Sequence, residues 1–195
     1  MKTIEKTLIL AKTDVLERGI LGRILQRFED AGLKIIGAKM VQANRTLAKK
    51  HYNGNKAWKL RIGQKVLESF ENYKIDIKEY MGTDKPVKLG ELIHQWSIEY
   101  LTKNPVLAMV IEGPHAVERV EEMCGSTEPK KAGRGTIRGD FCVDSILHAN
   151  MEKRAMFNLV HSSRTPKDAA REIKLWFKPS EIVAYKNKYE KVLAG

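Results

Sequence analysis

Two strand–helix–strand patterns constrain the fold more than any other feature of this sequence. In the first pattern, residues 7–11 form an apolar run that is typical of a short strand. Apolar residues then recur at helical spacing over residues 20–28 until Gly32, and residues 33–41 again have the pattern of a strand. The chain therefore alternates between strand and helix from its start.

The second pattern begins with the apolar run 106–111, which predicts a buried strand. A helix is expected over residues 115–123, a segment of loop and strand over 136–143, and a further helix over 171–177. Two such units predict an α+β sandwich, in which helices lie on one side of a small sheet.

Residues 53–104 separate the two patterns. Glycine and proline residues interrupt this segment, and helices are expected over 65–73 and 89–101. The segment holds no low-complexity tract and no repeat. We therefore expect a single domain over 1–195 with an elaborated middle, and a surface helix or tail over 181–194.

Composition limits the class of protein and of partner. Of the 195 residues, 43% are hydrophobic, which is enough for a core and excludes global disorder. The 35 Lys+Arg outnumber the 24 Asp+Glu and leave a net charge of +11, so the phosphates of a nucleotide, a nucleic acid or a membrane surface all fit as partners. The charge is spread along the chain without interleaved aromatic residues, so nucleic acid remains possible but is not favoured.

The cysteines and the N-terminus indicate the compartment. Cys124 and Cys142 cannot form a disulfide framework or a four-ligand zinc site. The first apolar run is too short for a signal peptide, and no stretch reaches the length of a membrane span. We expect a soluble, cytoplasmic protein with no membrane partner.

A glycine-rich basic loop covers residues 130–140. Three glycines and four basic residues lie in it, and such a loop can bring backbone N–H groups and arginine side chains close to an anion. The alternative is a flexible turn with solvated charges. No G-x-x-x-x-G-K-[ST] sequence occurs, which excludes an ordinary P-loop.

A histidine follows in a second candidate segment. His161 ends a short strand-like run and precedes Thr165 and Pro166, which are typical of the N-cap and first position of a helix. Lys12, which ends the first strand, is a third candidate. Together with the basic loop, a nucleophilic histidine beside a helix start can hold and transfer a phosphoryl group, although a lone histidine is often structural.

These segments resemble the nucleoside diphosphate kinase family, in particular its archaeal-type members with insertions. The matching stretches are TLILAKTDVLERGILGRILQRFEDAGLKIIGAKMVQ at 7–42, HY at 51–52, NPVLAMVIEG at 104–113, GSTEP at 125–129, GTIRGDF at 135–141 and NLVHSSRTPKDAAREIKLWFKPSEIVAYK at 158–186. The resemblance implies a ferredoxin-like α/β sandwich with a four-stranded antiparallel sheet. It also implies reversible, ping-pong transfer of the γ-phosphate of a nucleoside triphosphate to a nucleoside diphosphate, with Mg²⁺ bound through the phosphates.

The resemblance assigns roles to eight residues. His161 matches the phosphorylated histidine, Glu172 the carboxylate that orients it, and Ser163 a serine that supports this carboxylate. The positions that contact phosphate and ribose are Lys12, Tyr52, Thr127, Arg138 and Asn158. No residue is assigned as a metal ligand. The expected partners are nucleoside di- and triphosphates and further copies of the chain, in a hexamer or another assembly of dimers.

Four departures from the family pattern keep an alternative open. Thr13 replaces a proline, Glu121 stands where the family has an arginine, and no counterpart of the base-stacking phenylalanine is evident. Insertions lie within 53–104, where the family's nucleotide-clamping hairpin is found, and near 145–157. The alternative is a weakly active or inactive nucleotide- or nucleic-acid-binding protein of the same fold. The sequence does not specify a nucleobase.

Overall fold

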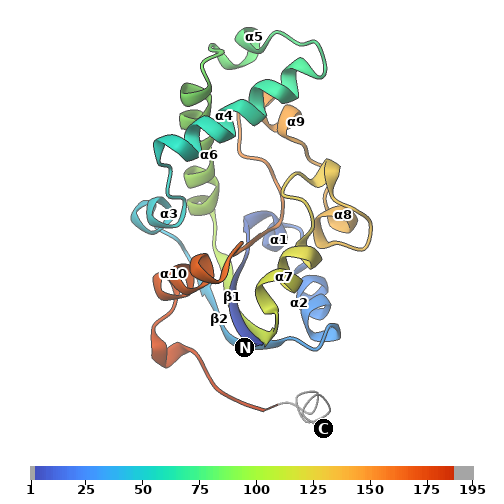
Figure 1. The fold of residues 1–195 in the computed structure, drawn as a ribbon, viewed down its shortest axis with the longest axis vertical. Coiled ribbons are helices and arrows are strands. Elements are labelled where there is room, and N and C mark those ends of the chain that lie inside the picture. The colour runs from blue at the N-terminus through green and yellow to red at the C-terminus, as the bar shows by residue number, and fades with distance from the viewer. Residues whose placement is uncertain (1–2, 187–195) are drawn as a thin grey trace.

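A computed structural model describes residues 3–186 of the chain, which contain one four-stranded sheet (Figure 1). Its strands are β1 (Ile4–Ala11), β2 (Lys34–Val41), β3 (Val106–Pro114) and β4 (Val160–Ser162). They lie in the order β2-β3-β1-β4, and every neighbouring pair is antiparallel. The expected four-stranded antiparallel sheet is confirmed.

Helices occupy the connections between the strands and also follow the last strand. They are α1 (Thr13–Glu17), α2 (Leu21–Asp30), α3 (Arg45–His51), α4 (Lys56–Glu71), α5 (Ile77–Met81), α6 (Pro86–Lys103), α7 (Ala116–Cys124), α8 (Ile137–Phe141), α9 (Ile146–Met151) and α10 (Pro166–Trp176), with short 3-10 turns η1 (Pro129–Lys131) and η2 (Pro179–Glu181). Within the described part of the chain, none of these helices has the length and apolar character needed to cross a bilayer.

Helices cover both faces of the sheet, so the expectation that they lie on one side was wrong. Alternate residues of a strand point to opposite faces. Ile9 of β1 belongs to a core with residues of α2, α7 and α8, whereas its neighbours Leu8 and Leu10 belong to a core with residues of α3, α6 and α10. Figure 1 shows these two groups of helices on opposite sides of β1. Because β1 is apolar at successive positions, each face needs its own cover.

The structure also corrects local expectations. Residues 136–143 contain α8 and no strand, because the Thr136 hydroxyl accepts a hydrogen bond from the Gly139 N–H and begins a helix there. The last helix starts at Pro166, with Thr165 as its N-cap as predicted. Of the segment 181–194, residues after 186 lie outside the described part of the chain, and the residues before them follow η2 without a further helix.

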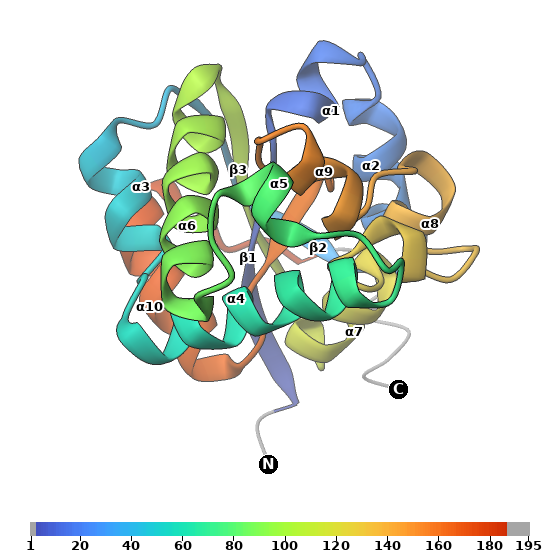
Figure 2. The ribbon, with the colours of Figure 1, turned by 90° about the horizontal axis from the view of Figure 1, so that it is seen from above.

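The segment 53–104 folds into α4, α5 and α6, which lie with α9 at one end of the molecule (Figures 1 and 2). Helices α4 and α6 cross at a close backbone contact. A Cβ atom added to Gly63 would lie 1.8 Å from the Pro86 carbonyl oxygen, and one added to Gly90 would lie 2.1 Å from the Lys59 carbonyl oxygen. The two glycines therefore permit a helix crossing that no larger residue allows.

We expect Gly63→Ala and Gly90→Ala each to lower the free energy of unfolding by about 1–3 kcal/mol or more, because the added methyl group meets backbone that must move. Gly22→Ala in α2 is the matched control, since its Cβ would meet nothing within 4 Å. This control should be neutral or stabilising by about 0.5–1 kcal/mol. Urea unfolding of the three variants measures the difference, and equal effects at all three positions would contradict the close crossing.

Candidate active site

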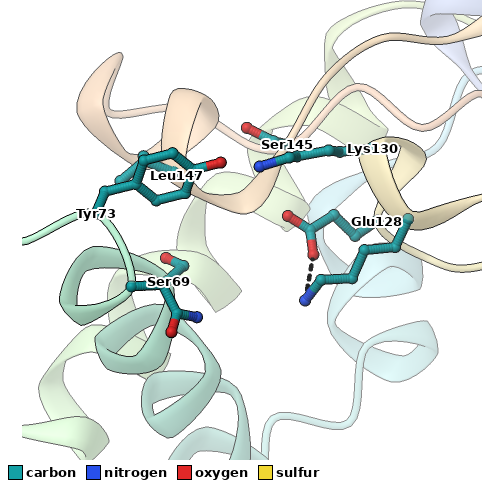
Figure 3. A pocket seen from close by; sticks show the side chains of 8 residues that line it. Ser69, Tyr73, Glu128, Lys130, Ser145 and Leu147 are labelled. Atoms are coloured by element: carbon teal, nitrogen blue, oxygen red, sulfur yellow. Dashed lines mark ion pairs between the residues drawn. The ribbon is translucent and has the colours of Figure 1, made fainter.

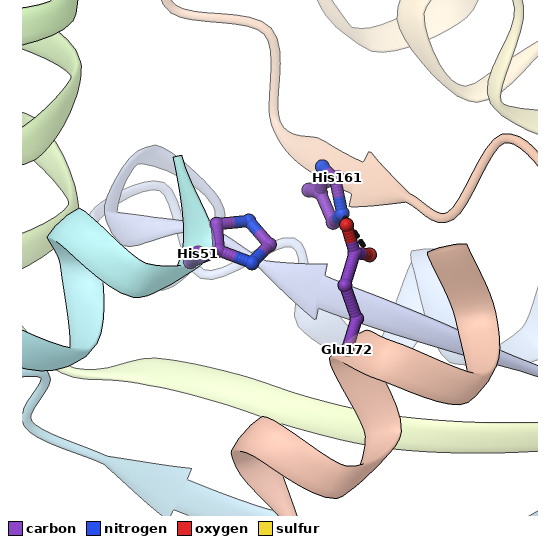
Figure 4. Close-up of side chains that lie close together, drawn as sticks. All are labelled: His51, His161 and Glu172. Carbon is purple, nitrogen blue, oxygen red and sulfur yellow. Dashed lines mark hydrogen bonds and ion pairs between the residues drawn. The ribbon is translucent and has the colours of Figure 1, made fainter. Parts of the chain in front are cut away.

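A hydrogen-bonded imidazole–carboxylate pair joins β4 to α10. Strand β4 pairs with β1, which places His161 opposite Leu10, and α10 carries Glu172. The His161 Nε2–H donates to Glu172 Oε2 across 2.7 Å (Figure 4). The Ser163 hydroxyl donates to the same oxygen across 2.7 Å, and Arg171 Nη2 donates to Oε1 across 2.8 Å. Glu172 is 4% exposed, so these donors replace its contact with water.

The charge of Glu172 determines the tautomer of His161. Burial by itself would raise the pKa of the Glu172 carboxyl, but the hydrogen bonds from His161 and Ser163 and the charge of the Arg171 guanidinium together hold it below its ordinary value. An ionised carboxylate only accepts hydrogen bonds. The hydrogen of neutral His161 therefore lies on Nε2, which leaves the lone pair of Nδ1 available as a nucleophile.

The chain enters β4 through a strained residue. Leu159 is fully buried and has a φ of 63°, a left-handed conformation that costs a non-glycine residue about 1–2 kcal/mol. Its N–H donates to Asp14 Oδ2 across 3.0 Å, and its carbonyl accepts from the Lys12 N–H across 2.8 Å. The segment after β1 thus holds the turn that positions His161.

Lys12 and Asn158 connect the end of β1 to the loop after α7. The Lys12 ammonium donates to Asn158 Oδ1, and Asn158 Nδ2 donates to the Thr127 carbonyl across 2.9 Å. Lys12 is 7% exposed. Burial lowers its pKa from 10.5 to about 8, against the opposing charge of Asp14. Lys12 is therefore mostly cationic at neutral pH, and its charge is poorly shielded by water.

Arg138 binds three backbone carbonyls around the same site. It is 4% exposed and lies in α8. Its Nε donates to the carbonyl of Asn158 across 3.1 Å, Nη1 to that of Gly125 across 2.5 Å, and Nη2 to that of Val160 across 2.8 Å. Burial lowers the pKa of Arg138, although arginine remains protonated in proteins. The guanidinium therefore places a fixed positive charge where three segments meet.

The two remaining predicted residues lie at the edge of this group. Tyr52 follows α3, and its ring centroid lies 4.8 Å from that of His51. Burial raises the pKa of the Tyr52 phenol, and the carboxylates of Glu172 and Asp14 raise it further, so the hydroxyl stays protonated. Thr127 is exposed in its loop, and its hydroxyl is therefore accessible to a ligand. The structure brings all eight predicted residues into one region.

Sequence reasoning missed the buried residues behind the site. Asp14 was not among the predicted residues, yet its carboxylate accepts a hydrogen bond from the Leu159 N–H. His51 is 3% exposed, and its ring centroid lies 4.3 Å from that of His161. Its position directly before Tyr52 in the HY pair is the signal that could have indicated it. Trp176, which donates to His51 Nδ1 across 3.3 Å, carries no such signal.

The structure shows the surroundings of two of the departures. The Glu121 carboxylate lies 4.0 Å from the Arg164 guanidinium, so its negative charge has a cationic neighbour. Among the aromatic residues of the insertion, Phe70 is 1% exposed within the core of α4–α6 and cannot stack on a base. Phe157, which is 39% exposed and directly precedes Asn158, is an accessible aromatic residue beside the site.

The insertion also packs close to the loop that carries Thr127. A cavity of about 260 Å³ lies between α4, this loop and α9 (Figure 3). On its wall, Lys131 forms an ion pair of 2.9 Å with Glu128, and the Lys130 ammonium lies 4.5 Å from the centre of the Tyr73 ring. The cavity does not include His161, but its wall begins one residue after Thr127.

The chain is similar to known proteins in sequence and in fold. The sequence model of the family described as nucleoside diphosphate kinase matches residues 5–79 and 86–182. The nucleoside diphosphate kinase of Pyrobaculum aerophilum is 42% identical over 180 residues, which cover 92% of this chain and 98% of the relative. That of Pyrococcus furiosus is 38% identical over 95% of this chain and 90% of its own length.

Solved structures show the same similarity. A crystal structure of an NDP kinase from Pyrobaculum aerophilum superposes with a TM-score of 0.88 at 41% identity, covering 93% of this chain and all of that one. A transition-state mimic of nucleoside-diphosphate kinase from Borrelia burgdorferi, with bound vanadate and ADP, has a TM-score of 0.76 at 34% identity. It covers 97% of this chain and 96% of its own.

The antiparallel β2-β3-β1-β4 sheet with helices on both faces places the protein among the ferredoxin-like α/β sandwiches, as predicted. Within that class, the chain belongs to the nucleoside diphosphate kinase family. It transfers phosphoryl groups between nucleotides.

We expect kcat/KM for a nucleotide substrate to fall as the pH rises above about 8, because the free protein then loses the Lys12 proton and with it a cation for phosphate. Lys12→Arg should flatten this limb, since arginine stays charged. Lys49→Arg, at an exposed position of α3, is the control and should keep the wild-type profile.

The lowered pKa of Lys12 also predicts a pH dependence of stability. The free energy of unfolding should rise as the pH increases from about 8 to 10.5, because only the unfolded chain binds the Lys12 proton in this range.

Proposed function

We propose that phosphoryl transfer proceeds in two steps through a phosphohistidine at His161. In the first step the Nδ1 lone pair attacks the γ-phosphorus of a nucleoside triphosphate. A nitrogen–phosphorus bond forms, the bond from phosphorus to the bridging oxygen breaks, and the diphosphate leaves with the bonding electrons. In the second step a terminal oxygen of another diphosphate attacks the phosphorus and His161 leaves. The hydrogen bond between His161 Nε2 and Glu172 is the observation that carries this proposal.

The surrounding residues would bind the nucleotide and offset the charge of the moving group. Lys12 and Arg138 provide fixed positive charge, which stabilises a phosphoryl transition state most where water is excluded. The hydroxyls of Tyr52 and Thr127 are available as donors to phosphate, and Asn158 as a contact to the sugar. Glu172 and Ser163 act through His161 and are positioning residues.

Mg²⁺ fits this site as a partner of the nucleotide phosphates. It prefers oxygen ligands and commonly binds through substrate phosphates with few protein ligands. Of the described residues, His51, His161 and Glu172 bring three ligand atoms within 4.8 Å of one another, but two of these atoms are imidazole nitrogens. When bound to the phosphates, Mg²⁺ would neutralise part of their charge. Lys12 and Arg138 would then face the remaining phosphate oxygens.

The finer organisation of the protein is also a proposal. We propose one catalytic domain over 1–195, in which the insertions of 53–104 and 145–157 pack beside the nucleotide-binding residues. We also propose that copies of the chain form an assembly of dimers or a hexamer. Exposed Met40 on the edge strand β2 supports a contact between copies. The cysteines Cys124 and Cys142 are both free, which supports a cytoplasmic location.

We expect ATP labelled at the γ-phosphate to leave acid-labile, base-stable label on the protein, and His161→Ala to abolish it. His148→Ala, at an exposed histidine of α9, is the control and should label fully. Glu172→Gln should lower the phosphorylation rate about 10- to 100-fold, because it weakens a charge-assisted hydrogen bond. Label that persists in His161→Ala would refute the phosphohistidine.

Turnover with several diphosphate acceptors separates this proposal from the alternative of weak transfer with nucleotide or nucleic-acid binding. We expect transfer to acceptors with different bases. Negligible turnover together with strongly salt-dependent DNA binding would favour the alternative.

A further inference from the structure

One buried nitrogen beside the nucleophile has no hydrogen-bond partner. His51 lies at the end of α3 and is 3% exposed, and its Nε2 finds no partner among the described residues. Buried polar side-chain atoms are hydrogen-bonded in the large majority of cases, and an unpaired one costs about 1–3 kcal/mol. The position of this nitrogen therefore calls for a functional explanation.

The hydrogen of the His51 ring lies on this unpaired nitrogen. The Trp176 indole N–H donates to His51 Nδ1 across 3.3 Å, so Nδ1 is the acceptor and carries no hydrogen. Burial lowers the pKa of His51 well below 6.5, and the nearby charges of Lys12 and Arg171 lower it further. His51 is therefore neutral at physiological pH, with Nε2–H as an unused donor.

The unused donor lies next to the group that accepts phosphate. The His51 and His161 rings meet edge to face, with centroids 4.3 Å apart and planes at 80° (Figure 4). Ligand atoms of His51, His161 and Glu172 all lie within 4.8 Å of one another. Glu172 is already supplied with donors by His161, Ser163 and Arg171. An oxygen that arrives on His161 is the acceptor that this arrangement lacks.

We infer that His51 is a hydrogen-bond donor reserved for the phosphoryl group on His161: its Nε2–H donates to a phosphoryl oxygen in the transition state and in the phosphohistidine. The inference rests on the proposed function. His51 keeps its hydrogen throughout, while the nitrogen–phosphorus bond forms on His161 and the bond to the leaving diphosphate breaks. A hydrogen bond to a charged oxygen is stronger than one between neutral groups. The donor therefore favours the phosphorylated protein over the free one.

A zinc ion is the alternative ligand for the same three residues, because two imidazoles and one carboxylate form a common zinc set. Zinc at Nε2 would require the hydrogen of neutral His51 to move to Nδ1. There it would face the Trp176 N–H, which already points at Nδ1. The hydrogen bond from Trp176 thus favours a donor role for His51 over metal binding.

The test compares His51→Phe, which keeps a ring and loses the donor, with His51→Gln, whose amide N–H can replace Nε2–H. We expect the equilibrium constant for phosphorylation of the protein by ATP, measured in single-turnover experiments, to fall about 10- to 100-fold in His51→Phe. In His51→Gln it should stay within about fivefold of wild type. An unchanged constant in His51→Phe, or an equal loss in both variants, would overturn the inference.

His51→Phe leaves the Trp176 indole N–H without its acceptor. The controls for this effect are Trp176→Phe and the double variant of Trp176→Phe with His51→Phe. The loss caused by His51→Phe should persist in the Trp176→Phe background, and a loss that vanishes there would assign the effect to packing. If wild-type protein does not label at His161, the proposed function fails; if it labels and His51→Phe matches it, only this inference fails.

Wild-type protein provides a test that needs no variant. In 15N-edited NMR, His51 should carry its hydrogen on Nε2, and this proton should move to lower field when His161 is phosphorylated. A hydrogen on Nδ1, or an unmoved signal, would contradict the donor role. Inhibition by Zn²⁺ at micromolar concentration that His51→Phe relieves would contradict it as well, since Nε2 would then be a metal ligand.

Discussion

The hydrogen bond from His161 Nε2 to Glu172 is the interaction on which the rest of the site depends. It requires β4 and α10 to be held in a fixed relation, which the pairing of β4 with β1 and the capped start of α10 at Thr165 provide. It also requires an ionised carboxylate in a buried place, which Ser163 and Arg171 stabilise. With that carboxylate in place, the nucleophile is a single nitrogen on a ring that cannot turn freely.

Several charged side chains of the site are buried away from water. Lys12, Arg138 and Glu172 are each less than 10% exposed. Burying a charge is costly unless hydrogen bonds replace the water, and here backbone carbonyls, an amide and a hydroxyl do so. The same exclusion of water strengthens every interaction with an incoming phosphate. On our inference, the free-energy cost of the unpaired His51 N–H is offset when His161 carries a phosphoryl group, because this N–H then has an acceptor.

The sequence predicted the strands of the sheet because their signals are local, whereas the candidate site residues came from the resemblance to the family. Apolar runs identified β1 and β3, and Thr165 with Pro166 identified the start of α10. The placement of helices on both faces was missed, because periodicity shows which residues of a helix are apolar but not which face of a sheet they meet. His51 and Asp14 were missed for a related reason: their functions come from contacts with His161 and Leu159, more than one hundred positions away.

The identity of the phosphorylated ring nitrogen tests the central claim most directly. Protein labelled with 15N-histidine and phosphorylated by ATP can be examined by long-range 1H–15N and 15N–31P NMR correlations. Because Glu172 holds the hydrogen of His161 on Nε2, the account predicts that phosphorus is bonded to Nδ1 and that Nε2 remains protonated. Phosphorus bonded to Nε2 would contradict it, since that atom could then not donate to Glu172.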